Sequence, residues 1–356
     1  MRGLRLRTDI DNLLTYGLVV VAYIVMRILI AGGNISSALQ GQLVPITAYI
    51  VMAISLNLTV GVLGELSLGH AGFMSVGAFS GVITATLLTD AIPMTWLRLA
   101  LAMFVGGLIA GIFGFLIGIP VLRLQGDYLA IVTLAFGEII KNVMNTIYLG
   151  YDANGLRISV QSGNALQLAE GGKVILNGPM GAIGITKLST FNAGFVLILI
   201  SLFVVLNLIN SKSGRAIKAV RDDKIAAESV GISIWRYRMM AFVTSATLAG
   251  AAGALYALNF TTVVSRKFDF NTSILVLVFV VLGGMGNIRG SIIAATVLTV
   301  LPEVLRAFNE VRMLVYAIIL ILVMLVKNNT NLRQFFRKNG SKRKNTLSAG
   351  KEGEDT

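Results

Sequence analysis

The chain has 356 residues, of which 55% are hydrophobic and 13% are charged, with a mean hydropathy of +0.80. Soluble domains carry about 25% charged residues, so an ordinary soluble fold is excluded. The net charge is +13, but 17 of the 30 basic residues fall in 2–7, 212–238 and 327–344. These segments flank apolar runs and lack the interleaved aromatic residues of nucleic-acid grooves, so no nucleic-acid partner is expected.

Several long windows contain no Asp, Glu, Lys or Arg: 28–64, 66–89, 99–122, 188–211, 239–265 and 270–288. A helix needs about 20 apolar residues to cross a bilayer. The windows predict an all-α polytopic bundle of about ten spans, at about 12–31, 43–62, 67–89, 99–119, 128–149, 190–210, 239–260, 270–286, 288–304 and 311–327. Eight to ten crossings remain open because 283–303 could be a re-entrant loop.

Basic residues beside spans favour the cytoplasmic side. With the N-terminus inside, ten spans place the 212–238 loop and the C-terminus inside as well. The basic N-terminus is interpreted as part of a retained first span, since no small-residue cleavage site follows it. We therefore expect a transmembrane domain over 1–330, with an extracytoplasmic cap at 150–189, a cytoplasmic loop at 211–238, and a disordered basic tail at 331–356.

Glycine is abundant, with 38 residues. The fourth and seventh predicted spans carry small residues at near-helical spacing, which favours close helix packing in lipid; these are Gly106, Gly107, Gly111, Gly114, Gly118, Ala246, Ala249, Gly250, Gly253 and Ala254. Four glycines within 61–72 instead predict a broken helix, tolerated where it lines a cavity or packs within protein. Glu65, Ser67 and His70 would then edge a pathway, or else lie in a tight cytoplasmic turn.

The fifth predicted span begins at Asp127, a candidate N-cap, and carries Glu138 and Lys141. These two residues, three apart, lie on one helix face and can neutralise each other. Charges at membrane depth tend to face a bundle interior or a cavity. The pair is therefore either a structural ion pair or part of gating or substrate passage.

The 212–238 loop contains a basic helix of about 12 residues that ends at Gly231. Ile217, Val220, Ile225 and Val230 give it a patchy apolar face. It is too short and too charged to span. It could lie along the membrane interface or insert into a groove of another protein.

The spacing of Ala226, Ala227 and Gly231 resembles the Glu-Ala-Ala-x-x-x-Gly loop through which bacterial ABC-importer permeases dock onto ATPases, with Ile225 where that motif has Glu. Three further segments resemble branched-chain amino-acid permeases of the LivM type. They are Leu56-Asn57-Leu58 with 61–73, Arg123-Leu-x-Gly126-Asp127-Tyr128 with Thr133, Leu134 and Glu138, and Leu282-Gly283-Gly284-Met-Gly286-Asn-x-x-Gly290. The resemblance covers about 43–330.

The resemblance implies a bacterial inner-membrane subunit working by alternating access. It implies a heterodimer with a second permease, two cytosolic ATPases that bind ATP and Mg, an extracytoplasmic solute-binding protein, and a surrounding of membrane lipid. The candidate ATPase-coupling residues are Arg215, Arg221, Asp222, Asp223, Ala226, Ala227, Glu228 and Gly231. The candidate pathway or gating residues are Asn57, Gly61, Gly64, Glu65, Ser67, Gly69, His70, Phe73, Asp127, Tyr128, Thr133, Glu138, Lys141, Gly283, Gly284 and Gly286.

This chain lacks a Gly-x-x-x-x-Gly-Lys-[Ser/Thr] loop, so no cofactor is expected in it. No cysteine and a single histidine leave no Cys or multi-His metal site within the chain. The expected cargo is leucine, isoleucine or valine, with urea or amides as alternatives. A self-sufficient ion-coupled transporter using Glu65, His70 and Glu138 is a second class. A membrane enzyme is a third, for which the chain offers little catalytic material.

Overall fold

The structure, a computed structural model, describes residues 2–33, 36–124, 126–152, 155–168 and 172–305, together with Leu314, Val315, Ala317, Ile318, Ile321 and Leu325. The chain divides into two units, 1–300 and 301–356. The first unit contains the helical bundle and all the contacts described below. The predicted tail at 331–356 and most of the predicted tenth span lie outside the described residues.

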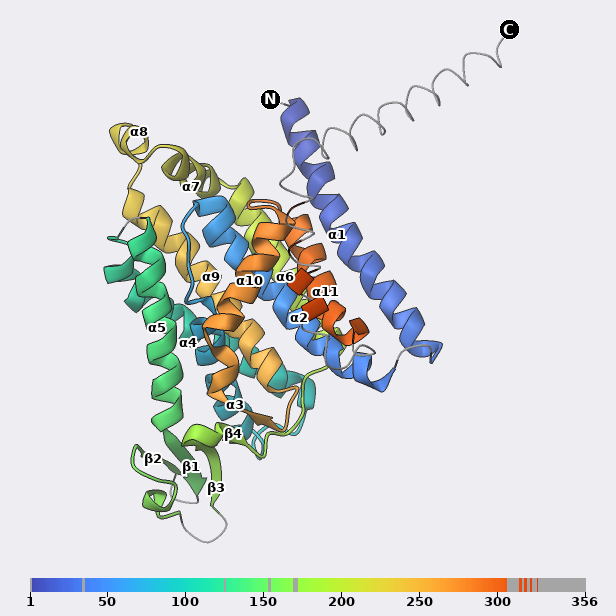
Figure 1. Ribbon diagram of the computed structural model, residues 1–356, viewed down its shortest axis with the longest axis vertical. Helices are drawn as coiled ribbons and strands as arrows, with labels where there is room; N and C mark the ends of the chain where they lie inside the picture. Colours follow the sequence, from blue (N-terminus) through green and yellow to red (C-terminus); the bar gives the residue numbers. More distant parts are fainter. Residues whose placement is uncertain are drawn as a thin grey trace. The chain divides into compact units, whose positions relative to one another are not determined.

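Nine helices fall on the first nine predicted spans (Figure 1): α1 Arg2–Ala31, α2 Ser37–Asn57, α3 His70–Leu87, α4 Thr95–Val121, α5 Asp127–Thr146, α6 Phe191–Asn210, α9 Ile234–Ala257, α10 Phe270–Gly283 and α11 Ile288–Val304. Among the described residues, the seven helices α1 to α6 and α9 are long and apolar enough to cross a membrane. The polytopic all-α fold is confirmed, with a somewhat lower span count. The 14 residues of α10 reach only about 21 Å at about 1.5 Å per residue.

Small residues hold the centre of the bundle together, where α3, α4 and α9 pack on one another. A Cβ added to Gly250 would overlap Ala110 and the backbone of Gly106, and one added to Gly253 would overlap the backbone of Met74. Gly114 likewise faces Ala246. The predicted stripes on the fourth and seventh spans are therefore packing surfaces, on which backbones approach closely.

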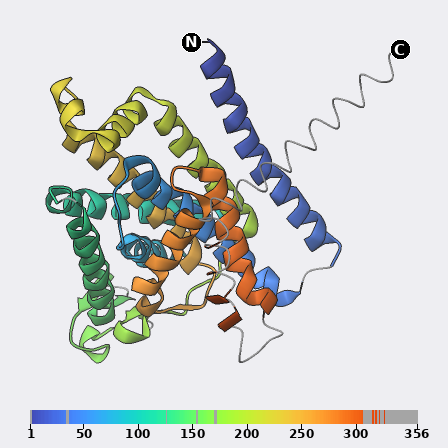
Figure 2. The same cartoon turned by 45° about the horizontal axis from the view of Figure 1, so that its top comes forward.

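Helix α1 lies at the edge of the bundle in both ribbon views (Figure 2), and only 11% of its apolar window is buried. It is anchored to α6 by Tyr23, whose ring stacks on Phe191 and Phe195 and whose hydroxyl donates to Asn192 Oδ1 over 3.0 Å. Most of its length is therefore left for contact with lipid or with another chain.

The predicted 150–189 loop contributes to a small antiparallel sheet that the sequence pattern did not predict. Its order is β2-β1-β3-β4-β5, and its strands are β1 Tyr148–Asp152, β2 Gly155–Ser159, β3 Lys173–Asn177, β4 Ala182–Ile183 and β5 Thr262–Val263. Tyr148 pairs with Ser159 and with Asn177 on either side of β1. The last strand, β5, follows α9, so the sheet ties two distant parts of the chain together. In Figure 1 the sheet lies at the opposite end of the bundle from the short helices α7 (Lys212–Asp222) and α8 (Lys224–Ser229).

Candidate functional site

The predicted break near 61–73 is an unwound connection between two buried helices. Helix α2 continues as a π-helix over Leu58–Leu63, ends at Gly64 in a left-handed conformation (φ 80°), and α3 begins at His70. A π-helical turn is rare and is frequent at functional sites. Residues 58–69, here called the broken segment, are buried apart from Gly64 and the partly exposed Leu66 and Leu68.

The turn between α10 and α11 clamps the end of α2. Asn57 Oδ1 accepts from the Gly286 backbone N–H over 2.8 Å, and Asn57 Nδ2 donates to Ser291 Oγ over 2.8 Å. A Cβ on Gly61 would overlap Gly286, while Gly283 and Gly290 are in close backbone contact across the turn. The two glycine-rich segments singled out in the sequence thus meet in space, with Gly284 and Gly286 both at positive φ.

Helix α5 contacts the other end of the broken segment. Thr133 Oγ1 accepts from the Leu68 backbone N–H over 3.1 Å, and a Cβ on Gly69 would overlap the Thr133 carbonyl. One turn further along, the Gly137 Cα would lie 3.0 Å from a Cβ on Gly72. Any shift of the broken segment therefore presses directly on α5.

His70 is a buried, satisfied histidine. Its Nε2 lies 2.8 Å from Ser55 Oγ, and the next backbone N–H, at Ala71, donates to Ser273 Oγ over 3.1 Å. Phe73 is also core, since its ring packs against Phe136 and Phe242. The structure thus places these two pathway candidates inside the bundle, with both side chains buried.

Glu65 is the charged centre of the broken segment. Its Oε1 lies 2.5 Å from Arg238 Nη2 and 3.7 Å from Lys224 Nζ, and the Glu65 and Arg238 side chains are only 9% and 5% exposed. Arg238 also donates to the carbonyls of Leu122 and Leu124. A buried carboxylate requires such pairing, because desolvation without it costs several kcal/mol. The Glu65 Oε2 and Ser67 Oγ atoms are buried without a hydrogen-bond partner among the described residues.

Helix α7 (Lys212–Asp222) joins the 211–238 loop to the broken segment. Arg221 Nη1 donates to the Gly61 carbonyl over 3.2 Å, while its Nε and Nη2 donate to Asp222 Oδ1 over 3.0 and 2.9 Å. Gly64 lies under the same side chain, where an added Cβ would be 2.5 Å from Arg221 Cγ. Arg221 thus contacts the break directly, whereas the coupling candidate Arg215 is exposed.

The predicted single basic helix is divided into two helices at Asp223. Asp223 caps α8 (Lys224–Ser229), and its Oδ1 accepts from the backbone N–H groups of Ile225 and Ala226 over 2.9 and 3.0 Å. At the other end, Gly231 (φ 82°) donates to Glu228 and Ile232 donates to Ala227. Those two bonds form the Schellman motif that terminates helices.

The division also splits the predicted apolar face. Ile217 and Val220 of α7 are buried, whereas Ile225 and Val230 are 83% and 74% exposed. The chain is extended at Asp223 between the two helices, and the apolar side chains of α8 do not continue the buried face of α7. Ala226 and Glu228 are exposed with them, and Ala227 is buried.

On α5, Gly126 at φ 60° occupies the N-cap position that the sequence pattern assigned to Asp127, so Asp127 begins the helix. Tyr128 is exposed. Lys141 and Glu138 form an ion pair, with 20% and 34% of their side chains exposed. Neither residue lies with the cluster around Glu65.

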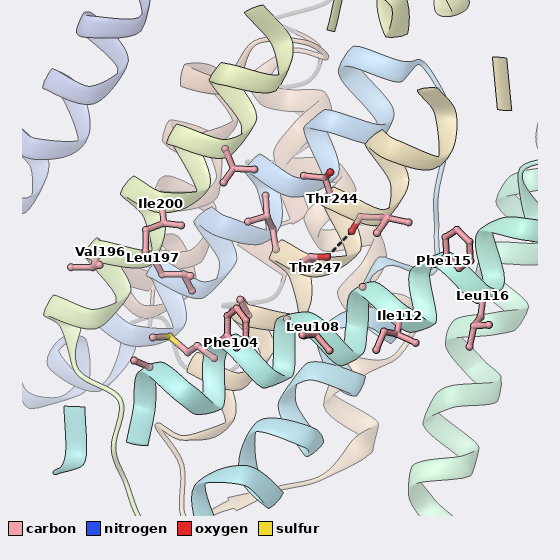
Figure 3. A pocket seen from close by; sticks show the side chains of 18 residues that line it. Phe104, Leu108, Ile112, Phe115, Leu116, Val196, Leu197, Ile200, Thr244 and Thr247 are labelled. Carbon is pink, nitrogen blue, oxygen red and sulfur yellow. Dashed lines mark hydrogen bonds between the residues drawn. The ribbon is translucent and has the colours of Figure 1, made fainter. Parts of the chain in front are cut away.

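A separate groove of about 960 Å³ lies between α4, α6 and α9 (Figure 3) and is almost entirely apolar. Its two hydroxyl groups, on Thr244 and Thr247, donate to carbonyls of their own helix. Phe104 and Ile112 on its wall are exposed. A groove that offers no free polar group fits hydrocarbon rather than a polar solute.

Sequence reasoning missed the partners that complete the site. Arg238 and Lys224 were counted only as cytoplasmic charge, and Ser55, Ser273 and Ser291 gave no signal against an apolar background. Arg238 could have been found as a basic residue at the very start of a predicted span, where a buried acid must balance it.

Comparison with known proteins agrees with this architecture. The family model described as "Branched-chain amino acid transport system / permease component" matches residues 38–324. The high-affinity branched-chain amino acid transport system permease protein LivM of Salmonella typhimurium is 38% identical over 287 residues, covering 78% of this chain but 66% of that relative's length. LivH of the same organism is 27% identical over 296 residues, covering 79% of this chain and 89% of LivH. A fructose import permease protein, FruG of Bifidobacterium longum, is 24% identical over 269 residues, covering 73% of this chain and 72% of FruG. The chain therefore belongs to the family of permease components of branched-chain amino acid transport systems.

Proposed function

We propose that this chain is one of two permease subunits of an ATP-driven importer of leucine, isoleucine and valine in a bacterial inner membrane. The observation that carries the proposal is α8, which presents two exposed apolar side chains, Ile225 and Val230, beside residues bonded to the broken segment. The names of the LivM and LivH relatives support both the cargo and the pairing of two different permeases.

A groove on a cytosolic ATPase is the partner that α8 fits best. Large apolar side chains on a capped, protruding helix match helix-in-groove recognition. A helix lying on the membrane surface would need a longer apolar face. Since this chain has no phosphate-binding loop, ATP and Mg would be bound by the ATPase subunits, and a solute-binding protein would deliver cargo on the opposite side.

Two contacts would carry motion from α8 and α7 to the membrane. Lys224, the first residue of α8, faces Glu65, and Arg221 of α7 holds the Gly61 carbonyl. A displaced coupling loop would therefore pull on both ends of the 61–65 stretch, which lacks regular α-helical bonding. That stretch is the natural hinge for alternating access.

Co-purification tests the docking assignment. The tagged chain, expressed with its partner permease and ATPases, should retain the ATPases, and Ile225→Asp with Val230→Asp should release them while the partner permease stays bound. Ile158→Asp, at a comparably exposed apolar position in β2 (68%) at the other end of the bundle, serves as the matched control. Full retention of the ATPases by the α8 variant would show that they dock elsewhere.

Leucine uptake by proteoliposomes with the complete complex tests the importer assignment. Uptake should require ATP inside and the binding protein outside. Uptake by this chain alone, driven by an ion gradient, would instead identify a secondary transporter. That class has less support, because Glu65 and His70 are already engaged with Arg238 and Ser55. A urea- or amide-specific binding protein would identify the other cargo class.

A further inference from the structure

Helix α5 turns an unpartnered face away from the bundle. Its inner side packs on α3, where Ile140 joins Val76 and Ala110 in a buried cluster. Only 22% of its apolar window is buried. Ile131 and Ile139 on its outer side are 61% and 59% exposed.

The Glu138–Lys141 ion pair lies within this helix at membrane depth. Glu138 is the twelfth of the 20 residues of α5, so it lies about 17 Å from the helix start at about 1.5 Å per residue. Both side chains are partly exposed, and in the described part of the chain each is paired only with the other.

Hydrocarbon is a poor environment for such a pair. A charged side chain at the centre of a bilayer costs about 2.5 kcal/mol or more, and ionisable residues within spans face bundle interiors or water-filled cavities. The groove between α4, α6 and α9 is almost entirely apolar, as a surface in contact with hydrocarbon must be. The face of α5 that carries the pair differs from that groove because it presents a partly exposed acid and base, paired with each other, so it belongs on a polar route.

We propose that Glu138 and Lys141 form a transit site for zwitterionic amino acids, in which Glu138 receives the α-ammonium group and Lys141 the α-carboxylate. This inference rests on the proposed import function and specifies that the membrane domain binds the α-ammonium and α-carboxylate groups of the cargo. The two charges of an α-amino acid are about as far apart as those of a salt bridge, within about 4 Å. Cargo can therefore exchange one internal ion pair for two external ones without any change of net charge in the membrane.

The site is connected to the coupling loop. The broken segment contacts α5 at Thr133 and Gly137, five residues and one residue before Glu138. Movement of Arg221 and Lys224 would pass through the broken segment to α5. The transit site would thereby be accessible first from one side of the membrane and then from the other.

Uptake of radiolabelled leucine by the reconstituted complete complex tests the site. Glu138→Gln and Lys141→Gln should each lower the maximal uptake rate at least tenfold. The half-saturating leucine concentration, which the binding protein sets, should stay the same. ATP hydrolysis and co-purification of the partners should persist in both variants. Asn142→Gln, at an exposed position of the same helix, should behave like the unaltered chain.

The double variant Glu138→Gln/Lys141→Gln separates a transit site from a structural ion pair. Removing both charges relieves the unpaired charge left by either single variant, so a purely structural pair predicts recovery of uptake. The transit site predicts that uptake stays at least tenfold low, and recovery would overturn it while leaving the import function intact. Absence of uptake of any zwitterionic amino acid by the unaltered complex would instead overturn the import function and the transit site together.

Accessibility gives a second readout. The chain has no cysteine, so a single Ala135→Cys on the outer face of α5 can be modified selectively. In the complete complex it should react with a charged, membrane-impermeant thiol reagent, more slowly when leucine and ATP are present. Phe104→Cys in the apolar groove should not react. Equal protection of both cysteines from the reagent would place α5 against lipid and exclude the transit site.

Discussion

At the scale of single residues, Glu65 is a buried carboxylate paired with two cations. Glu65 pairs with Arg238 from α9 and with Lys224 from α8, so one side chain of the broken segment contacts both a membrane helix and the 211–238 loop. The pair with Arg238 is shielded from water and the one with Lys224 is partly open. The first is suited to hold the fold and the second to break and re-form.

Removal of the Glu65 carboxylate alone should destabilise the folded protein. Glu65→Leu leaves the Arg238 charge buried without its acid and should lower the free energy of unfolding by about 3 kcal/mol. Adding Arg238→Met should restore part of that loss, because an apolar pair can replace a buried ion pair. Thermal unfolding of the purified chain in detergent measures both, and equal stability of the single and double variants would contradict the pairing.

At the scale of elements, end signals decide what the 211–238 loop becomes. Asp223 ends α7 and begins α8, and Gly231 terminates α8 through a left-handed residue. Six residues are too few for a helix to persist by propensity alone. The caps at Asp223 and Gly231 therefore determine whether α8 forms and holds Ile225 and Val230 in fixed, exposed positions.

Substitution of the cap should weaken ATPase docking without unfolding the bundle. Asp223→Ala removes the acceptor of two backbone N–H groups and should cost α8 about 1 kcal/mol, which lowers ATPase affinity about fivefold. Asp223→Asn keeps an acceptor at the same place and should bind nearly normally. Titration of the ATPases against the purified permease pair measures both affinities. If the two variants are weakened equally, the loss comes from the charge of Asp223. If neither is weakened, Asp223 does not contribute to docking.

At the scale of the whole molecule, the 1–300 unit is a helical bundle with different structural elements at its two ends. Helices α7 and α8 occupy one end, and the five-stranded sheet occupies the other (Figure 1). The strand β5 comes from the segment after α9, so the sheet closes over the ends of distant helices. In the proposed importer, the ATPases would dock at the end with α7 and α8, and cargo would be delivered at the end with the sheet.

Labelling from the two sides tests that orientation. In intact cells with a permeable outer membrane, Ser162→Cys near the sheet should react with an impermeant thiol reagent, while Ser229→Cys on α8 should not. In inverted vesicles the reactivities should exchange. Reaction of both cysteines from one side would disprove the assigned topology.

Much of this architecture could be predicted from sequence patterns within single segments of the chain. Charge-free windows located six of the nine helices, α2 to α4, α6, α9 and α10, because hydrocarbon disfavours charge over the length of each span. The glycines of 61–72 indicated the break because four of them cannot sustain a regular helix. The position of Gly231 at the end of a short basic helix was also correct. Each of these signals acts within one segment of chain, so it can be read without knowing what lies beside it.

The tertiary structure decided what depends on distant neighbours. Asn57 and Ser291 are hydrogen-bonded although 234 residues apart, and no local pattern specifies that contact. The same holds for Arg238 beside Glu65, for β5 in the sheet, and for Ile217 buried while Ile225 is exposed. The amino-acid sequence by itself determined which segments enter the membrane, since that follows from transfer of each side chain out of water. Only the packed structure decided which polar groups meet there, because a buried charge takes whatever partner the fold brings within reach.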